Sequence, residues 1–165
     1  MTSIYQKHSK LNIGALELCD LPELGVEKLQ VRVDTGAATS SLHVDNIEEY
    51  SRGGEHFVSF DLHPDIHNVN KIIRTTVEVE ETKKVKSSSA ELEKRVVITT
   101  NIRMAGIEWP IKINLTDRSE MTYMMLLGRE AMEGRVLVDP EYEYLLSVDD
   151  YEDEEYLPVA FEEEE

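Results

Sequence analysis

The residue best placed to do chemistry in this sequence is a carboxylate at the end of a strand-like segment. Residues 29–37 read Leu-Gln-Val-Arg-Val-Asp-Thr-Gly-Ala, with apolar and polar side chains alternating up to Asp34. This alternation predicts a half-buried strand, so Asp34 leaves the sheet where the chain turns. Gly36 permits the turn and the close approach of another backbone. Asp-Thr-Gly at this place fits a turn that presents an acid, and it also fits an ordinary strand exit.

A second motif lies downstream of this turn. Residues 124–132 read Met-Met-Leu-Leu-Gly-Arg-Glu-Ala-Met. An apolar run followed by Gly-Arg and good helix formers predicts a buried strand, a tight turn and a helix over about 129–132. Asp-Thr-Gly-Ala upstream of Leu-Leu-Gly-Arg resembles the paired signatures of retropepsins, the small dimeric aspartic proteases.

The resemblance becomes closer when further segments are included, and it covers roughly residues 11 to 147. Together the segments resemble a bacterial family labelled both ATP-dependent zinc protease and retropepsin-like aspartic endopeptidase domain. Some members of that family accompany a ligase that adds glutamates to a ribosomal protein. The segments that carry the resemblance are residues 32–43, 85–89, 115–119, 126–129 and 137–140.

This resemblance implies a site and an assembly. It makes Asp34, Thr35 and Gly36 the catalytic turn, with Thr35 bracing the two turns of a dimer. Peptide hydrolysis by this route needs two carboxylates that share a proton, and this chain has one Asp-Thr-Gly. A homodimer with one Asp34 from each protomer is therefore expected. The residues expected to support the turn are Ala37, Leu127, Gly128 and Arg129.

The pattern of short strands predicts the fold class. Many short strands with almost no amphipathic helix favour an all-β fold, a closed or partly closed barrel of retropepsin type with one short C-terminal helix and extensions. The protease domain is expected over 11–147, with a flexible N-terminus over 1–10 and an acidic, mobile tail over 149–165. Strands are predicted at 11–18, 28–33, 57–62, 72–79, 95–102, 107–115 and 144–148, with a short strand and turn over 136–140.

The charge and the single cysteine exclude several classes of partner. The formal charge is −17, and residues 149–165 hold ten acidic residues with no Lys or Arg, which leaves −7 for the rest. An acidic body disfavours nucleic acid, whose binding needs a basic face. No run approaches the roughly 20 apolar residues that a membrane span needs. The lone Cys19 and the absence of a signal-like N-terminus predict a reducing, cytoplasmic setting.

Basic residues between the predicted strands suggest the substrate. The segment 83–89, which includes Lys86, Ser87 and Ser88, is either a flap over the cleft or a solvated hairpin tip. With Arg74, Arg95 and Arg118, which stand in otherwise apolar contexts, it would suit an acidic or glutamate-tailed peptide. The family resemblance agrees and adds a ribosomal-protein glutamate ligase system as a partner. The acidic body would repel such a peptide at long range, so recognition requires a local basic cleft.

Three histidines, His43, His63 and His67, are weak candidates for metal ligands. His63 and His67 are four residues apart, which aligns two ligands only on a helix, and Pro64 favours an irregular loop instead. We expect His43 to orient the loop after the turn, and we expect no metal and no other cofactor. Two alternatives stay open: a non-catalytic module that binds acidic peptides on the same fold, and a zinc-dependent hydrolase.

Overall fold

The computed structural model describes residues 10–64, 70–86, 90–117 and 122–146. Most of the expected N-terminal segment and the acidic tail lie outside these ranges. Between residues 22 and 24 the chain forms a single 3-10 turn. The strands and the one α-helix are β1 (Leu11–Ile13), β2 (Leu16–Leu21), β3 (Val26–Val33), β4 (Ser40–His43), β5 (Asp45–Arg52), β6 (Glu55–Leu62), β7 (Ile73–Glu78), β8 (Glu81–Lys86), β9 (Leu92–Met104), β10 (Ile107–Thr116), β11 (Met125–Leu127), α1 (Arg129–Met132) and β12 (Val136–Val138).

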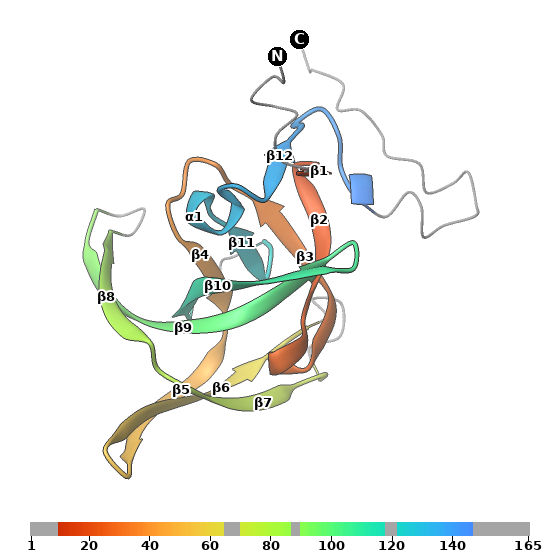
Figure 1. Cartoon of the computed structure of the whole chain (residues 1–165). Helices are drawn as coiled ribbons and strands as arrows, with labels where there is room; N and C mark the ends of the chain where they lie inside the picture. The colour runs from red at the N-terminus through yellow and green to blue at the C-terminus, as the bar shows by residue number, and fades with distance from the viewer. Residues whose placement is uncertain (1–9, 65–69, 87–89, 118–121, 147–165) are drawn as a thin grey trace.

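Six strands close into a barrel (Figure 1). Their order is β10-β4-β11-β3-β2-β9, and pairing of β9 with β10 completes the ring. β8 extends from the outer side of β9 as the second arm of a long hairpin. The predicted all-β barrel with one short helix is therefore confirmed.

Alternating side chains fill the barrel interior, because successive residues of a strand face opposite sides of the sheet. On β10 this places Trp109, Ile111 and Ile113 inside, while the intervening Pro110 and Lys112 face outward. Each large apolar side chain buried in this way contributes about 1.5–3 kcal/mol. The fully buried large side chains include Leu29, Leu42, Phe60, Ile98, Ile102, Ile113, Met125 and Leu127.

Two parallel pairings organise the part of the barrel that carries Asp34. β11 runs parallel to β3, with Met125 opposite Val31 and Leu127 opposite Val33. Its other edge pairs antiparallel with β4, which in turn lies parallel to β10. The Leu-Leu-Gly-Arg segment therefore lies directly beside the strand that ends at Asp34.

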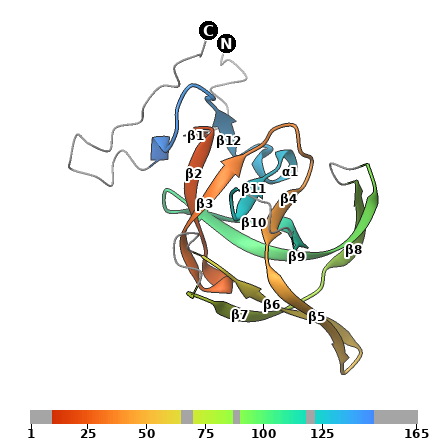
Figure 2. The same cartoon turned by 180° about the vertical axis from the view of Figure 1, so that it is seen from behind.

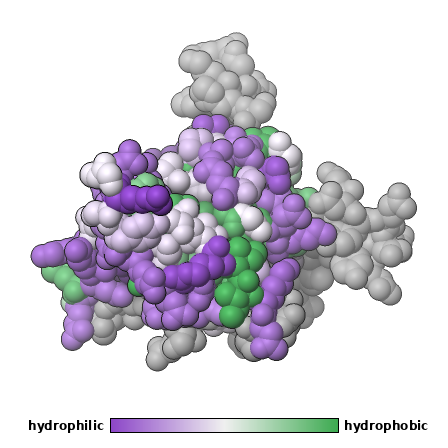
Figure 3. All heavy atoms as spheres, turned by 90° about the horizontal axis from the view of Figure 1, so that it is seen from below, coloured by the Kyte–Doolittle hydropathy of each residue, from purple (hydrophilic) through white to green (hydrophobic). Residues whose placement is uncertain are grey.

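A second sheet of three strands, β5-β6-β7, packs below the barrel (Figures 1 and 2). Val58, Phe60 and Leu62 of β6 are buried in the same hydrophobic core as the barrel strands. The far end of the β5–β6 hairpin carries Tyr50 and Phe57, whose rings stack with centroids 5.8 Å apart. Seen from below, the surface is mostly hydrophilic with smaller apolar areas (Figure 3). Neither β4 nor β5 was predicted from the sequence.

The chain after β12 returns along the start of β2. Tyr144 donates its backbone N–H to the Leu16 carbonyl (2.8 Å), and Ala15 donates to the Tyr142 carbonyl (2.7 Å). The predicted strand at 144–148 is wrong for its described part, since residues 144–146 form no ladder and end in a short turn. The side chain of Glu17 explains this path, because it accepts the backbone N–H of Leu146 instead.

Glu17 is a fully buried carboxyl, and its burial makes stability depend on pH. Loss of solvation raises its pKa above 4.5, while backbone N–H groups of Leu146 and Gly14 act in the opposite direction. A raised pKa in the folded state means that folding favours the protonated form. The contribution of this group to stability is therefore full below pH 4.5 and is lost as the pH rises through the folded pKa.

We expect Glu17→Gln to become progressively more favourable relative to the wild type as the pH rises above 4.5. The measurement is the free energy of unfolding of both proteins in urea across this range. Glu17→Ala, which leaves both backbone N–H groups without an acceptor, should cost about 1–3 kcal/mol. A difference between Glu17→Gln and the wild type that does not change with pH would show that burial does not perturb this carboxyl.

Candidate functional site

The Asp34 turn is held by its own backbone and by β11. Asp34 follows the last residue of β3 and donates its N–H to the Leu127 carbonyl (2.9 Å). One carboxylate oxygen, Oδ1, accepts the N–H of Gly36 at 3.0 Å. The carboxylate is partly exposed, while Thr35 and Gly36 at the tip of the turn are exposed. The acid therefore has a fixed orientation at an open surface.

Gly128 lies behind the turn in a space that holds no side chain. Its N–H donates to the Ser40 hydroxyl at 2.9 Å. A Cβ at this position would overlap the Thr39 carbonyl and lie 2.8 Å from the Ser40 nitrogen. Only glycine allows the two backbones to approach so closely.

The start of α1 is capped by the turn itself. The first N–H groups of a helix lack partners inside the helix. Here Arg129 donates its N–H to the Ala37 carbonyl (2.7 Å), and Glu130 donates to the Ala38 carbonyl (3.0 Å). The Arg129 guanidinium adds a hydrogen bond to the Thr35 carbonyl at 3.0 Å. The Arg129 side chain therefore contacts the backbone of the Asp34 turn, the turn that it was expected to support.

The far end of α1 is fixed to the barrel wall. Trp109 of β10 donates its indole N–H to the Ala131 carbonyl at 3.0 Å. The Arg135 guanidinium lies over the same ring, 5.9 Å from its centroid. The position of α1, and with it the turn that caps α1, therefore depends on the buried face of β10.

A polar network supports the chain that follows the turn. Asn114 of β10 accepts hydrogen bonds from the Ser41 hydroxyl (2.9 Å) and the Arg95 guanidinium (3.1 Å). Its amide nitrogen donates to the Thr39 hydroxyl at 3.3 Å. Arg95 is only 6 % exposed and also contacts Glu93. The structure thus places Arg95 beneath the surface, with its guanidinium directed to Asn114 and Glu93.

A pocket of about 250 Å³ opens beside this network. Two of its lining residues are lysines, Lys83 of β8 and Lys112 of β10. The Lys112 ammonium lies 3.8 Å from a carboxylate oxygen of Glu81. The sequence analysis did not single out Lys112, although its outward position between Ile111 and Ile113 was visible in the alternation. The lining consists of Thr39, Glu81, Lys83, Val97, Lys112, Asn114 and Glu130.

The remaining basic candidates are not gathered at the Asp34 turn. Arg74 lies on β7 of the lower sheet, where its guanidinium pairs with Asp61 at 2.9 Å and Glu48 at 3.3 Å. Lys86 is exposed at the end of β8, close to the tip of the β8–β9 hairpin. The other predicted substrate contacts, Ser87, Ser88 and Arg118, lie outside the described residues.

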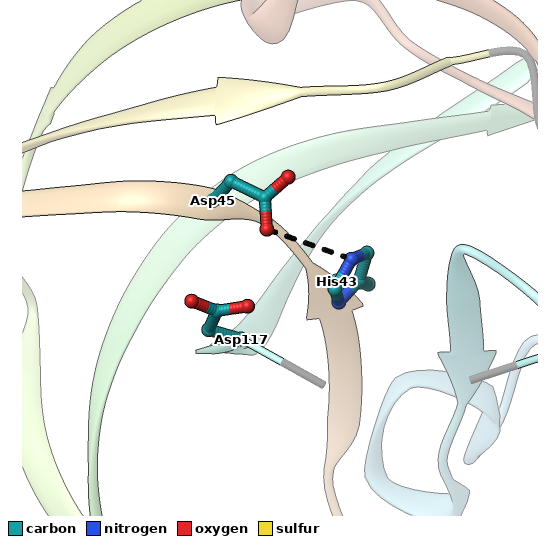
Figure 4. Close-up of side chains that lie close together, drawn as sticks. All are labelled: His43, Asp45 and Asp117. Atoms are coloured by element: carbon teal, nitrogen blue, oxygen red, sulfur yellow. Dashed lines mark ion pairs between the residues drawn. The ribbon is translucent and has the colours of Figure 1, made fainter. Parts of the chain in front are cut away.

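A separate cluster of possible ligands lies at the far end of β4. His43, Asp45 and Asp117 come from the end of β4, the start of β5 and the residue after β10 (Figure 4). Loss of solvation raises the pKa of Asp117, and the hydrogen bond and negative charge of Asp45 raise it further, whereas His43 acts in the opposite direction. His63 joins from the end of β6, with its Nε2 2.5 Å from Asp45 Oδ2. His67 lies outside the described residues.

The interlocked Asp34 and Gly128 segments can be compared with known proteins. A family model described as "Retropepsin-like aspartic endopeptidase RimB" matches residues 12–148. The chain belongs to this RimB-like family. The match includes the Asp-Thr-Gly-Ala turn and the Leu-Leu-Gly-Arg segment, so the expected family is confirmed.

The relatives that resemble this RimB-like chain are much longer proteins. It is 48 % identical over 139 residues to a protein of Shewanella halifaxensis named "Probable alpha-L-glutamate ligase", and 46 % identical over 132 residues to one of the same name from Parasynechococcus marenigrum. These matches cover 84 % and 80 % of this chain but only 30 % and 28 % of the relatives. The chain therefore spans less than a third of the length of these proteins.

A solved structure supports the RimB-like fold. The crystal structure of Lpg0085, a Legionella pneumophila protein of unknown function, matches with a TM-score of 0.67 and 31 % sequence identity. The match covers 84 % of this chain and 99 % of that one. Within the described ranges, no helix has the length and apolar character needed to cross a membrane.

Proposed function

We propose that this chain is one half of an aspartic peptidase that hydrolyses peptide bonds through the Asp34 carboxyls of two protomers. The observation that carries the proposal is the fixed orientation of Asp34, with Oδ1 bound by the Gly36 N–H and the turn bound by Leu127 and Arg129. Membership of a family described as aspartic endopeptidases supports it. The sequence holds one Asp-Thr-Gly, so the second acid must come from another chain.

The chemistry follows from two carboxyls that share one proton. The ionised Asp34 removes a proton from water, and the water oxygen attacks the carbonyl carbon of the peptide bond. The protonated Asp34 donates its proton to the carbonyl oxygen as the tetrahedral intermediate forms. As the C–N bond breaks, the protonated carboxyl gives its proton to the departing nitrogen. The other carboxylate takes a proton from a hydroxyl of the intermediate as the carbonyl re-forms, which restores the shared-proton pair.

Several features of the surface suit a two-fold dimer. Thr35 and Gly36 are exposed at the tip of the turn, where a second turn can approach. Among the residues that the structure describes, β1 and β12 form a sheet of two strands, and the edges of such a sheet can offer backbone groups to a partner. Leu137 on β12 is an apolar side chain with 46 % of its surface exposed. Pairing of these elements between protomers would bring the two Asp34 turns together.

The proposed substrate is a peptide rich in glutamate. Lys83 and Lys112 line a pocket that also includes Thr39, five residues after Asp34. The ammonium groups of Lys83 and Lys112 would suit the carboxylates of a peptide bound in this pocket. The relatives are named as glutamate ligases, and a ligase forms the kind of bond to glutamate that the proposed peptidase would break. A glutamate ligase system acting on a ribosomal protein remains the proposed source of such a substrate.

Neutralising both lysines with Lys83→Gln and Lys112→Gln should raise KM for a glutamate-tailed peptide about 5-fold per lysine and leave kcat unchanged, since an exposed charge pair contributes up to about 1 kcal/mol. The same change at Lys71, an exposed lysine near β7, is the matched control and should have no effect. Steady-state hydrolysis at low and moderate salt gives both constants. An unchanged KM in the double variant would remove this pocket from the substrate site.

A second candidate function is an accessory module that binds acidic tails without cleaving them. It is favoured by the relatives, in which the matched domain accounts for only 28–30 % of a chain named as a ligase. Binding of a glutamate-tailed peptide with no hydrolysis by the wild type would support the module. Hydrolysis that is lost in Asp34→Asn while binding persists would support the peptidase.

A further inference from the structure

A group of side chains of the types that can bind a metal gathers at the end of β4 away from the Asp34 turn. One ligand atom each from His43, Asp45 and Asp117 lies within 4.8 Å of the others. β4 begins at Ser40, next to the catalytic turn, and reaches His43 about 10 Å further on, at roughly 3.3 Å per residue. Asp45 and Asp117 point toward one another beside His43 (Figure 4). We call these three residues the His43 cluster.

His63 lies against one carboxylate of the His43 cluster. Its Nε2 lies 2.5 Å from Asp45 Oδ2, while Asp45 Oδ1 faces His43 Nε2 at 3.8 Å. This His63 nitrogen is inaccessible to solvent and makes no well-directed hydrogen bond in the described part of the chain. Histidine–carboxylate contacts of this kind orient carboxylates that bind metal ions. Asp45 therefore presents one oxygen to His63 and the other to the centre of the cluster.

A buried hydroxyl next to the cluster provides an independent observation. Thr116 is 2 % exposed, and its Oγ1 finds no hydrogen-bond partner among the described residues. Thr116 lies directly opposite His43 in the parallel pairing of β10 with β4, so both side chains share one face of the sheet. A buried hydroxyl without a partner costs about 1–3 kcal/mol. A water bound to an ion in the cluster would supply the missing partner.

We propose that His43, Asp45 and Asp117 bind a divalent transition-metal ion of the zinc type. One imidazole nitrogen and two carboxylate oxygens suit zinc, which takes three protein ligands and a water in many sites. Ligands at 2.0–2.1 Å in a tetrahedron are about 3.3–3.4 Å apart, so the 3.8 Å between His43 and Asp45 requires a closure of about half an ångström. The ion would connect β4, β5 and the end of β10, far from the carboxyl that performs hydrolysis.

The experiment measures zinc binding by the full chain after chelator treatment and removal of the chelator. Competition with a chromophoric chelator gives stoichiometry and affinity, and Co²⁺ in place of Zn²⁺ reports coordination by its visible absorption. We expect one equivalent per chain in the wild type and in Asp34→Asn. Binding should weaken at least about 100-fold in His43→Gln and Asp117→Asn, and about 10- to 100-fold in His63→Gln.

The matched control is His56→Gln on β6, because His56 is partly exposed and pairs with Glu49 outside the cluster. It should bind zinc as the wild type does. Imidazole NMR of the wild type keeps the test decisive if a variant fails to fold, since zinc should shift the His43 signals and leave those of His56 unchanged. No zinc equivalent in the wild type, unchanged affinity in folded His43→Gln and Asp117→Asn, or unshifted His43 signals would overturn the proposal. Zinc binding is measured without hydrolysis, so this test is independent of the proposed peptidase activity.

Discussion

Asp34→Asn is expected to reduce hydrolysis of a glutamate-tailed peptide by at least about 10³-fold, within the range that general acid–base catalysis contributes. The asparagine keeps the shape of the side chain and can still accept the Gly36 N–H through its oxygen. It cannot take a proton from water or share one with a second carboxyl. Initial rates at matched protein concentration, with thermal melting of both proteins, separate a chemical defect from a folding defect.

Glu27→Gln is the matched control for this prediction. Glu27 is an exposed acid on β3, the strand that ends at Asp34, and its replacement removes the same charge. It should leave the rate of hydrolysis within about 2-fold of the wild type, because water and salt screen the interaction of an exposed charge with the active site. If Asp34→Asn were no slower than Glu27→Gln, the catalytic role of Asp34 would be refuted.

Gly128→Ala is expected to be the most destabilising single substitution in the site. The added methyl group would overlap the Thr39 carbonyl and press against the Ser40 nitrogen, both of them backbone atoms that cannot move aside as a side chain can. Overpacking of flexible side chains costs about 1–3 kcal/mol, so a clash with backbone should cost at least about 3 kcal/mol. Urea unfolding measures the difference in the free energy of unfolding between Gly128→Ala and the wild type. A variant that is already unfolded without urea would also agree with the prediction.

Gly54→Ala provides the comparison for the glycine prediction. Gly54 lies in the β5–β6 turn with a φ of +81° and open space around its Cα, so an alanine there meets strain but no clash. Its cost should be about 1–2 kcal/mol, the usual value for a left-handed alanine. Equal destabilisation by Gly54→Ala and Gly128→Ala would mean that the close approach behind the catalytic turn is not important for stability.

The sequence predicted the barrel and the strand that ends at the Asp34 turn because their patterns are local. Alternation up to Asp34 predicted β3, and the apolar run before Gly128 predicted β11. Their contact also followed from the resemblance to retropepsins. β4 escaped prediction because two of its four buried residues are serines, whose hydroxyls are satisfied by Asn114 and by the Gly128 N–H. These partners lie more than 70 residues away and leave no trace in a local pattern.

The same limit explains the site residues that sequence analysis placed incorrectly or missed. Arg95 was expected to contact an acidic substrate because of its charge, and the structure instead buries it, with Asn114 accepting its hydrogen bond. From the sequence, the spacing of His63 and His67 would align two metal ligands only on a helix. The structure instead brings His63 to Asp45, which stands on a different strand. The surroundings of Arg95 and His63 depend on contacts between segments far apart in the sequence, which the spacing of residues does not reveal.

The central claim is that each active site needs Asp34 from two chains, and mixing of subunits tests it most directly. Wild-type and Asp34→Asn chains are combined in varying ratios at constant total concentration, under conditions that allow exchange, and the hydrolysis rate is measured for each mixture. If both carboxyls are required, activity falls with the square of the wild-type fraction and is about 25 % at an equal mixture, the share of dimers with two wild-type chains. A linear decline, with about 50 % activity at the equal mixture, would mean that each chain works alone and would contradict the account.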